Sequence, residues 1–471
     1  MSEANGTKRQ LEDGKENENK KRKTEEKEAG VLLFSGLTNY EERNDNKLTK
    51  SPSIKWSPHR FETLEGVRIR DVSSGPVSYF FLAISDSGQV YGWGLNQKGQ
   101  LGMDDYKMRR NPTLIESLTG HNVIAVATGK QHSLFLTDEG QVFACGDNKS
   151  GQCGIGNKKE TVSSPTRIDY SGTKITKIAC GADFSLILNE DGEVYSFGHP
   201  EYGQLGLGSE NKEIAARKEV YHCEYSPMLI SSYIEFDADT NELIGHGQPK
   251  ITAIACGVNH SCAIDDQQRL FTWGFGGYGR LGHNSTRNEL VPRLMKCWYR
   301  ITGRADGGVT NVYCGGQFTM VQTVAQKCTL MFGQFRIISE ANMYPKFLSD
   351  LQGWNVRHVV CNQQGYITCA DDAVIASQPS PAYGTLALGE TKKSSAAPSI
   401  VTTLKDVYCH RVGIGYMHSL YIARDESKKD KTAIEKFPTM KLDDDEKPPV
   451  VEEKKKTKKK QGKKKKQGKK K

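Results

Sequence analysis

Three glycines, Gly274, Gly276 and Gly279, have the GxGxxG spacing that in nucleotide-binding proteins brings backbone N–H groups close to a pyrophosphate. That chemistry requires a strand before the glycines and a helix after them. Here the segment continues as Arg280-Leu-Gly-His and lies in the register of a loop that recurs along the chain. We therefore interpret it as a structural loop and expect no nucleotide cofactor.

Histidine followed by serine occurs at His132, His260 and His418, and such a pair could supply a general base and a nucleophile. A nucleophilic site also needs an orienting acid in a single pocket, whereas these pairs occupy equivalent places in repeated segments. The repetition favours a structural role in which the hydroxyl bonds backbone groups beside a strand start. We therefore predict no catalytic residue.

Cysteines recur in the same way, at Cys180, Cys256, Cys314 and Cys361. The chain has 12 cysteines, and its first 30 residues are charged without an apolar run, so we expect no secretory signal and free thiols in a reducing compartment. No CxxC or HxxxH pair occurs, so we expect no metal site and interpret the recurring cysteines as small buried apolar residues.

No stretch approaches 18 apolar residues, so no membrane span is expected.

The most concentrated charge is a lysine run at residues 454–471. The formal net charge of the chain is +9, but this run holds 13 lysines and no acid, which leaves residues 30–423 near −1. The candidate polyanion-binding residues are Lys454, Lys455, Lys456, Lys458, Lys459, Lys460, Lys463, Lys464, Lys465 and Lys466. Lysines without aromatic neighbours bind phosphates regardless of sequence and with steep salt dependence, so DNA, RNA and the acidic tails of tubulin are suitable partners. The alternative is a tail for solubility or nucleolar retention.

A second basic pattern lies in residues 1–29, which we expect to be disordered. Ten spacer residues separate its two parts, and its members are Lys8, Arg9, Lys20, Lys21, Arg22 and Lys23. This bipartite pattern predicts binding to an import receptor. The alternative is a solvated tail of mixed charge, because acidic residues are interleaved with the basic ones.

Between the tails, residues 30–424 consist of repeated units. Gly88, Gly140 and Gly192 mark successive copies at a period of 52 residues. Each unit contains a hairpin of two apolar runs around a glycine turn, a Gly-Gln-Leu-Gly loop or a variant of it, and two further strand-like segments. Such a unit cannot bury both of its faces alone, and stacking the units radially gives an all-β propeller.

The number of blades follows from the ends of the repeat region. Six copies are followed by a half-copy at 413–426 that contains only one strand of its hairpin. The missing partner is the segment GVLLFSG at 30–36. We therefore predict a seven-bladed β-propeller whose N-terminal strand closes the ring, followed by a disordered tail at 425–471. We expect a monomer, because a closed ring leaves few exposed sheet edges.

The repeats resemble those of the regulator-of-chromosome-condensation family of seven-bladed propellers. The resemblance covers about 30–424 and rests on the period and on the Cys-Gly, Ser, Gly and Gly-Gln-Leu-Gly pattern. Two copies depart from it, because residues 333–346 lack the Gly-Gln-Leu-Gly loop and Cys361 is followed by Asn362. The family's founding member is an exchange factor for Ran, but its exchange-critical loops have no position-by-position match here, so no catalytic residue is carried over.

Within the family, several segments resemble a branch that acts in mitosis. Among them are LLFSGLTNY (32–40), WSPHRFETLEGVRIR (56–70), TWGFGGYGRLGH (272–283) and GYMHSLYIARDES (415–427). The resemblance implies a protein of the nucleus, nucleolus and chromosomes that associates with spindle or midzone microtubules and acts on small GTPases of the Rac, Ral or Arf type. Two classes of function stay open. One is a scaffold that binds GTPases, and the other is a true guanine-nucleotide exchange factor, which makes no covalent bond.

Two segments are candidate partner-binding loops, since loops on rigid scaffolds commonly carry binding. One follows the first repeat and includes Asp104, Asp105, Tyr106, Arg109 and Arg110. The other is an insertion near 207–250, where the period lengthens from 52 to 76 residues, and its candidates are Tyr233, Glu235 and Asp237. Residues 229–236 have the pattern of one strand before a turn. The alternative for the insertion is a longer outer hairpin of one blade.

Overall fold

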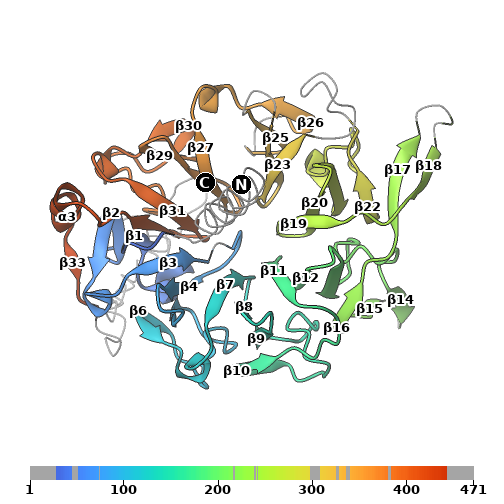
Figure 1. Cartoon of the computed structure of the whole chain (residues 1–471), viewed down its shortest axis with the longest axis horizontal. Helices are drawn as coiled ribbons and strands as arrows, with labels where there is room; N and C mark the ends of the chain where they lie inside the picture. Colours follow the sequence, from blue (N-terminus) through green and yellow to red (C-terminus); the bar gives the residue numbers. More distant parts are fainter. Residues whose placement is uncertain are drawn as a thin grey trace, which may run out of the picture.

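The computed structural model describes residues 28–44, 51–73, 75–215, 218–237, 240, 242–296, 308–324, 328–335, 340–379 and 383–442. Seven sheets surround a central axis, which confirms the predicted seven-bladed propeller (Figure 1). From hub to rim, blade 1 contains β3 (Ile69–Val72), β4 (Phe80–Ser85), β5 (Val90–Gly94) and β6 (Arg109–Leu114). Blade 2 contains β7 (Val123–Thr128), β8 (His132–Thr137), β9 (Val142–Asp147) and β10 (Thr161–Arg167).

The next four blades repeat this order. Blade 3 contains β11 (Ile175–Cys180), β12 (Phe184–Asn189), β13 (Val194–Gly198) and β16 (Glu224–Leu229). Blade 4 contains β19 (Ile251–Cys256), β20 (His260–Asp265), β21 (Leu270–Gly274) and β22 (Glu289–Leu294). Blade 5 contains β23 (Val309–Cys314), β24 (Phe318–Thr323), β25 (Thr329–Gly333) and β26 (Asn342–Phe347). Blade 6 contains β27 (Val356–Cys361), β28 (Tyr366–Ala370), β29 (Ala373–Gln378) and β30 (Ser395–Ile400).

The second strand of each blade forms the core of the ring. Every residue of β8 and of β12 is buried, because each strand pairs on both sides within its sheet and packs against neighbouring blades on both faces. Gly140 and Gly192 adopt φ values of +81° and +87° in the turns that follow these strands, which explains the glycine at each repeat. Short 3-10 turns lie at η1 (Tyr40–Asn44), η3 (Glu62–Leu64), η4 (Glu116–Leu118), η5 (Gly277–Gly279), η7 (Ser349–Leu351) and η8 (Thr402–Leu404).

The N-terminal strand closes the ring as the repeats predicted. Blade 7 has the order β31 (Cys409–Ile414), β32 (His418–Ala423), β1 (Val31–Leu37), β2 (Ile54–Phe61) and β33 (Thr439–Met440). β1 pairs antiparallel with β32 in a register that joins Val31 to Ala423 and Gly36 to His418. The two ends of the folded chain therefore share one sheet.

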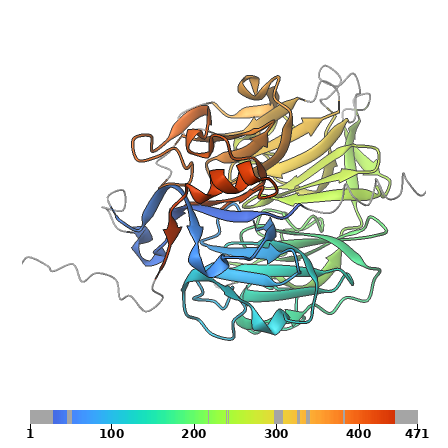
Figure 2. The ribbon, with the colours of Figure 1, turned by 60° about the vertical axis from the view of Figure 1, so that its left-hand side comes forward.

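The folded region extends further than the predicted boundary at residue 424. Helix α3 (Lys428–Glu435) and β33 follow blade 7, and β33 pairs in parallel with β2 through Arg60 and Phe61 (Figure 2). Ser427 caps the helix with a capping box that involves Asp430. Ile434 is buried in the cluster that contains Leu33. The predicted disordered tail therefore begins too early, and only its part after residue 442 lies outside the described residues.

The insertion divides into two hairpins rather than one. β14 (Lys212–Ala215) and β15 (Lys218–Tyr221) form a separate two-stranded sheet before the outer strand of blade 3. β17 (Tyr233–Asp237) and β18 (Glu242–His246) then extend the outer edge of blade 4, where β17 pairs in parallel with β22. The single strand predicted at 229–236 is wrong, because β16 ends at Leu229 and β17 begins at Tyr233 in the next blade.

Candidate functional site

The histidines that could have formed nucleophilic pairs are structural. His132 is buried beside Ser185 of blade 3, and burial lowers its pKa to about 3. Burial likewise lowers the pKa of His260 and of His418 well below the ordinary value. The serines that follow two of them donate to a loop of the preceding repeat, Ser133 to the carbonyl of Gln100 and Ser261 to that of Gln204. These hydroxyls fasten neighbouring blades together.

The GxGxxG segment is a loop of blade 4, as predicted. Gly274 ends β21, and the short turn η5 follows where a nucleotide site would need a helix. Arg280 follows the turn, and its buried guanidinium stacks over the ring of Phe275. The same guanidinium donates a hydrogen bond to the carbonyl of Gly316 in blade 5. The segment therefore fastens blade 4 to blade 5.

The rim loop after blade 1 is held by its own contacts. Asp105 accepts hydrogen bonds from Asn96 and forms an ion pair of 2.6 Å with Arg109. Burial would raise the pKa of Asp105, but bonds from Arg109 and the backbone outweigh it and hold the pKa below its usual value. Asp104 accepts from Ser163 on β10 of the next blade. These contacts brace the loop and attach it to the next blade.

Two other residues of this loop differ in their access to a partner. Arg110 is buried, so it does not present its charge at the rim. Tyr106 keeps 51% of its surface exposed while its hydroxyl lies 3.2 Å from Oγ1 of Thr161. Of the five loop candidates, Tyr106 offers the most apolar surface to a partner.

The candidates in the insertion are also brought to different environments. Tyr233 is buried in the core of blade 4, edge-on to Phe271, so its ring is not available for binding as predicted. Glu235 forms an ion pair of 3.1 Å with Lys296. Asp237 ends β17 and is partly buried. The prediction for Tyr233 is wrong because the break after β16 places this residue against the next blade.

The insertion carries exposed apolar side chains that the sequence pattern did not single out. They are Ile214, Val220, Met228, Leu229, Leu243 and Ile244, with exposed fractions from 38% to 77%. Lys212, Glu213, Glu219 and Glu242 lie among them on the same hairpins. These exposed apolar side chains, which lie outside the repeated core, are candidates for a protein–protein contact. In the sequence, these residues could have been noticed because Ile214 and Leu243-Ile244 are apolar but lie in segments that have no counterpart in the other repeats.

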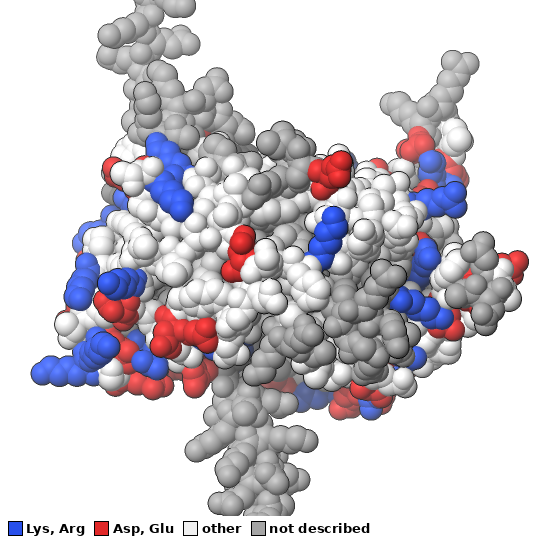
Figure 3. All heavy atoms as spheres, turned by 90° about the horizontal axis from the view of Figure 1, so that it is seen from above, with Lys and Arg blue, Asp and Glu red and all other residues white. Residues whose placement is uncertain are grey.

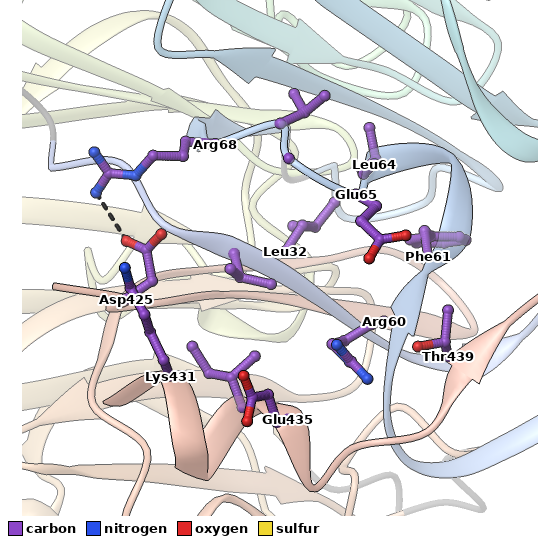
Figure 4. Close-up of a pocket in the computed structure, with 14 residues that line it drawn as sticks. Leu32, Arg60, Phe61, Leu64, Glu65, Arg68, Asp425, Lys431, Glu435 and Thr439 are labelled. Atoms are coloured by element: carbon purple, nitrogen blue, oxygen red, sulfur yellow. Dashed lines mark hydrogen bonds and ion pairs between the residues drawn. The ribbon is translucent and has the colours of Figure 1, made fainter. Parts of the chain in front are cut away.

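A cavity of about 370 Å³ lies between blade 7 and α3 (Figure 4). Leu32, Phe61, Leu64 and Ile434 line it with apolar surface. Charged side chains of both signs surround that surface, namely Arg60, Glu65, Arg68, Asp425, Lys431 and Glu435, and Arg68 pairs with Asp425 at 2.8 Å. An apolar floor surrounded by charges of both signs suits the binding of an amphipathic group. The sequence did not reveal it because α3 was not predicted.

Charges of both signs are interspersed on the side of the ring drawn in Figure 3. This agrees with a repeat region of near-zero net charge. The import pattern Lys8 to Lys23 and the lysines from Lys454 onward lie outside the described residues.

None of the helices in the described part of the chain has the length and hydropathy that crossing a membrane requires.

Comparison with known proteins agrees with this architecture. The family model described as RCC1-like domain matches residues 27–321. This chain belongs to the RCC1-like domain family. Among its members, Protein RCC2 of mouse and of human are each 42% identical over 419 residues, which cover 87% of this chain and 79% of theirs. Protein RCC2 homolog of Xenopus laevis is 42% identical over 422 residues.

Solved structures share the fold of this RCC1-like chain. Yeast RCC1 (Prp20), in a structure with Kap60, gives a TM-score of 0.67 at 19% identity and covers 87% of this chain and 92% of its own. Human WBSCR16 gives a TM-score of 0.66 at 22% identity and covers 85% of this chain and 100% of its own. At these identities the likeness concerns the propeller alone.

Proposed function

We propose that this RCC1-like propeller is a nuclear regulator that binds small GTPases, with the insertion at 207–250 as its main contact. The observation that carries the proposal is the set of exposed apolar side chains on the two hairpins of the insertion, above all Ile214 and Leu243. The hairpin β17–β18 extends the sheet of blade 4, which holds Leu243 and Ile244 in place and so reduces the entropy lost on binding. A structural relative, Prp20p of Saccharomyces cerevisiae, is described by its binding to Gsp1p and histones.

The resemblance noted in the sequence selects GTPases of the Rac, Ral or Arf type as first candidates. Binding and exchange are separate outcomes at this surface. A scaffold binds the GTPase whether or not nucleotide is present, whereas an exchange factor binds the nucleotide-free form more tightly and so speeds release. No described residue is assigned a catalytic role, because exchange needs only this difference in affinity.

The test measures binding to purified Rac, Ral, Arf and Ran-type GTPases and the release of fluorescent GDP from each. A double variant, Ile214→Ser with Leu243→Ser, is compared with Tyr344→Ser with Phe347→Ser. These two control residues on β26 of blade 5 are as exposed as Leu243 and less exposed than Ile214. We expect at least a tenfold loss of affinity in the insertion variant and no loss in the blade 5 variant. Faster release identifies an exchange factor, binding without faster release identifies a scaffold, and no binding to any GTPase overturns the proposal.

We also propose that the N-terminal basic pattern directs import into the nucleus. In support, the structure of yeast RCC1 (Prp20) was determined with Kap60. Changing Lys20, Lys21, Arg22 and Lys23 to alanine should abolish nuclear accumulation of the full chain. The matched control changes Lys428 and Lys429, an exposed pair on α3, and should leave accumulation intact. Equal accumulation of both variants would contradict this role.

The lysine run completes the proposal by attaching the propeller to polyanions. In interphase we expect it to hold the protein on nucleic acid in the nucleus and nucleolus, and in mitosis on chromosomes and on spindle or midzone microtubules. The run provides adhesion that is blind to sequence, while the ring selects the protein partner.

A further inference from the structure

Three groups that bind soft metal ions meet in the seam between blades 4 and 5. A ring nitrogen of His260 and the sulfurs of Cys262 and Cys314 all lie within 4.8 Å of one another. His260 and Cys262 are neighbours on one side of β20, and Cys314 ends β23 of the next blade. All three side chains are buried. The cluster lies on the inner strands β20 and β23, whereas β17 and β18 of the insertion lie at the outer edge of blade 4, so it is not part of the proposed GTPase contact.

Hydrogen bonds around the cluster fix which nitrogen of His260 is protonated. The hydroxyl of Thr319 donates to the carbonyl of Arg280 at 2.9 Å, so its oxygen accepts from Nε2–H of His260, also at 2.9 Å. The lone pair of His260 therefore lies on Nδ1, which has no hydrogen-bond partner among the described residues. A histidine that donates one N–H and keeps the other nitrogen bare is a neutral imidazole, the charge state that ligates a metal.

The two sulfurs are hydrogen-bonded thiols that lie slightly closer together than two thiolates sharing a tetrahedral ion. Sγ of Cys262 and Sγ of Cys314 are 3.5 Å apart. Two thiolates bound to one Zn²⁺ at about 2.3 Å each lie roughly 3.8 Å apart in tetrahedral geometry. A disulfide would need about 2.05 Å. The observed distance is that of thiols placed side by side and not covalently joined.

Comparison among the blades shows what is special about this seam. In the seam between blades 2 and 3, His132 also has a bare Nδ1 and Cys180 occupies the place of Cys314, but the residue two after His132 is Leu134. The bare histidine nitrogen is therefore a feature of the repeat. The cysteine at position 262 is what adds a second sulfur and completes the group of three.

We infer that His260, Cys262 and Cys314 form a zinc site that joins blade 4 to blade 5. The binding step replaces the two thiol protons with one Zn²⁺, releases two H⁺ and leaves every oxidation state unchanged. Two thiolates, one neutral imidazole and Zn²⁺ sum to zero charge, which suits a seam buried away from water. Three protein ligands leave a fourth position of the tetrahedron open. Burial raises the pKa of Cys314, so the metal must supply the attraction that displaces the proton.

The repeat supplies variants whose new side chains occupy the equivalent position in other blades. Cys262→Leu places at 262 the residue that blade 2 has at 134, and His260→Phe places at 260 the residue that blade 3 has at 184. Cys223→Ser serves as the control, because Cys223 is partly exposed and lies outside the cluster. The full chain is purified without chelator, and metal is measured by elemental analysis together with the mass of the intact protein.

The expected result is about one zinc per chain in the wild type and in Cys223→Ser, falling at least fivefold in Cys262→Leu and in His260→Phe. Chain produced in cobalt-supplemented medium should show thiolate-to-cobalt charge-transfer absorption, which both cluster variants lose. Equal zinc in all four proteins, or no zinc in the wild type, overturns the inference. A mass lower by two hydrogen atoms, which reports a disulfide between Cys262 and Cys314, also overturns it.

Discussion

The imidazole of His132 in blade 2 donates from Nε2 to the hydroxyl of Ser185 in blade 3, at 3.0 Å. The direction is fixed because Ser185 itself donates to the carbonyl of Gln152 at 2.9 Å. The hydroxyl of Ser185, on β12 of blade 3, therefore bonds both His132 and the loop residue Gln152 of blade 2. All three groups are buried, so none can exchange its partner for water.

Replacing Ser185 with alanine should destabilise the propeller by about 1–3 kcal/mol, because it leaves the N–H of His132 and the carbonyl of Gln152 buried without partners. Unfolding in urea, followed by circular dichroism, measures the change. Thr173→Ala removes a hydroxyl from an exposed residue before β11 and should change stability by no more than about 0.5 kcal/mol. Equal effects of the two variants would show that the buried chain of hydrogen bonds contributes nothing.

The buried histidines predict a loss of stability in mild acid. His132 stays neutral in the folded state because burial lowers its pKa from 6.5 to about 3. Between those pH values only the unfolded chain takes up the proton, so this residue should cost about 1.4 kcal/mol of stability per pH unit as the pH falls below 6.5. His260 and His418 act in the same direction.

His132→Phe isolates this effect, since phenylalanine occupies the same position in blades 3 and 5. Between pH 6.5 and about 4, the free energy of unfolding of the variant should fall less steeply than that of the wild type. The two slopes should differ by about 1.4 kcal/mol per pH unit, which is the contribution of one proton. Urea titrations at several pH values measure it. The same slope in wild type and variant would mean that His132 is protonated in the folded protein.

The strand β1 should be needed for ring stability because it joins the two ends of the propeller. Leu33 is fully buried where β1 lies between β32 and β2, so Leu33→Ala should cost about 2–5 kcal/mol. Deleting residues 30–36 should abolish the native melting transition. Val31 at the start of the same strand is only partly buried, and Val31→Ala should cost less. A melting transition that survives the deletion unshifted would show that blade 7 does not need β1.

The C-terminal extension should behave as part of the fold up to residue 442. Removing 427–471 uncovers the apolar surface that Ile434 covers and should lower the melting temperature, whereas removing 443–471 should not. Ile434→Ala should cost about 2–5 kcal/mol, and Glu435→Ala on the exposed side of α3 no more than about 0.5 kcal/mol. Identical melting of both truncated chains would contradict a structural role for α3.

The lysine run should account for most of the binding to polyanions. Deleting residues 454–471 should weaken binding to duplex DNA or microtubules and flatten the dependence of log K on log salt. For duplex DNA the slope should shrink by about 0.9 for each phosphate that the shortened chain no longer neutralises. Titrations at several salt concentrations measure both the affinity and the slope. An unchanged slope would assign the binding to the ring.

The sequence by itself determined the features that repeat or are local. Period, hairpin turns and the half-copy at each end predicted seven blades and their closure, since Gly140 and Gly192 are needed by the turns in which they lie. The histidine-serine pairs were correctly interpreted as structural because a residue that recurs in equivalent blades serves the blade.

Only the tertiary structure decided what lies next to what between distant segments. α3 occurs once and belongs to no repeat, so its packing on blade 7 and the cavity beneath it left no periodic signal. Tyr233 and Ile214 are both apolar residues of the insertion, yet one is buried in blade 4 and the other is 77% exposed. Cys262 and Cys314 are 52 residues apart and meet only because adjacent blades share a seam. Composition and spacing describe each strand, whereas contact between blades depends on how the whole ring closes.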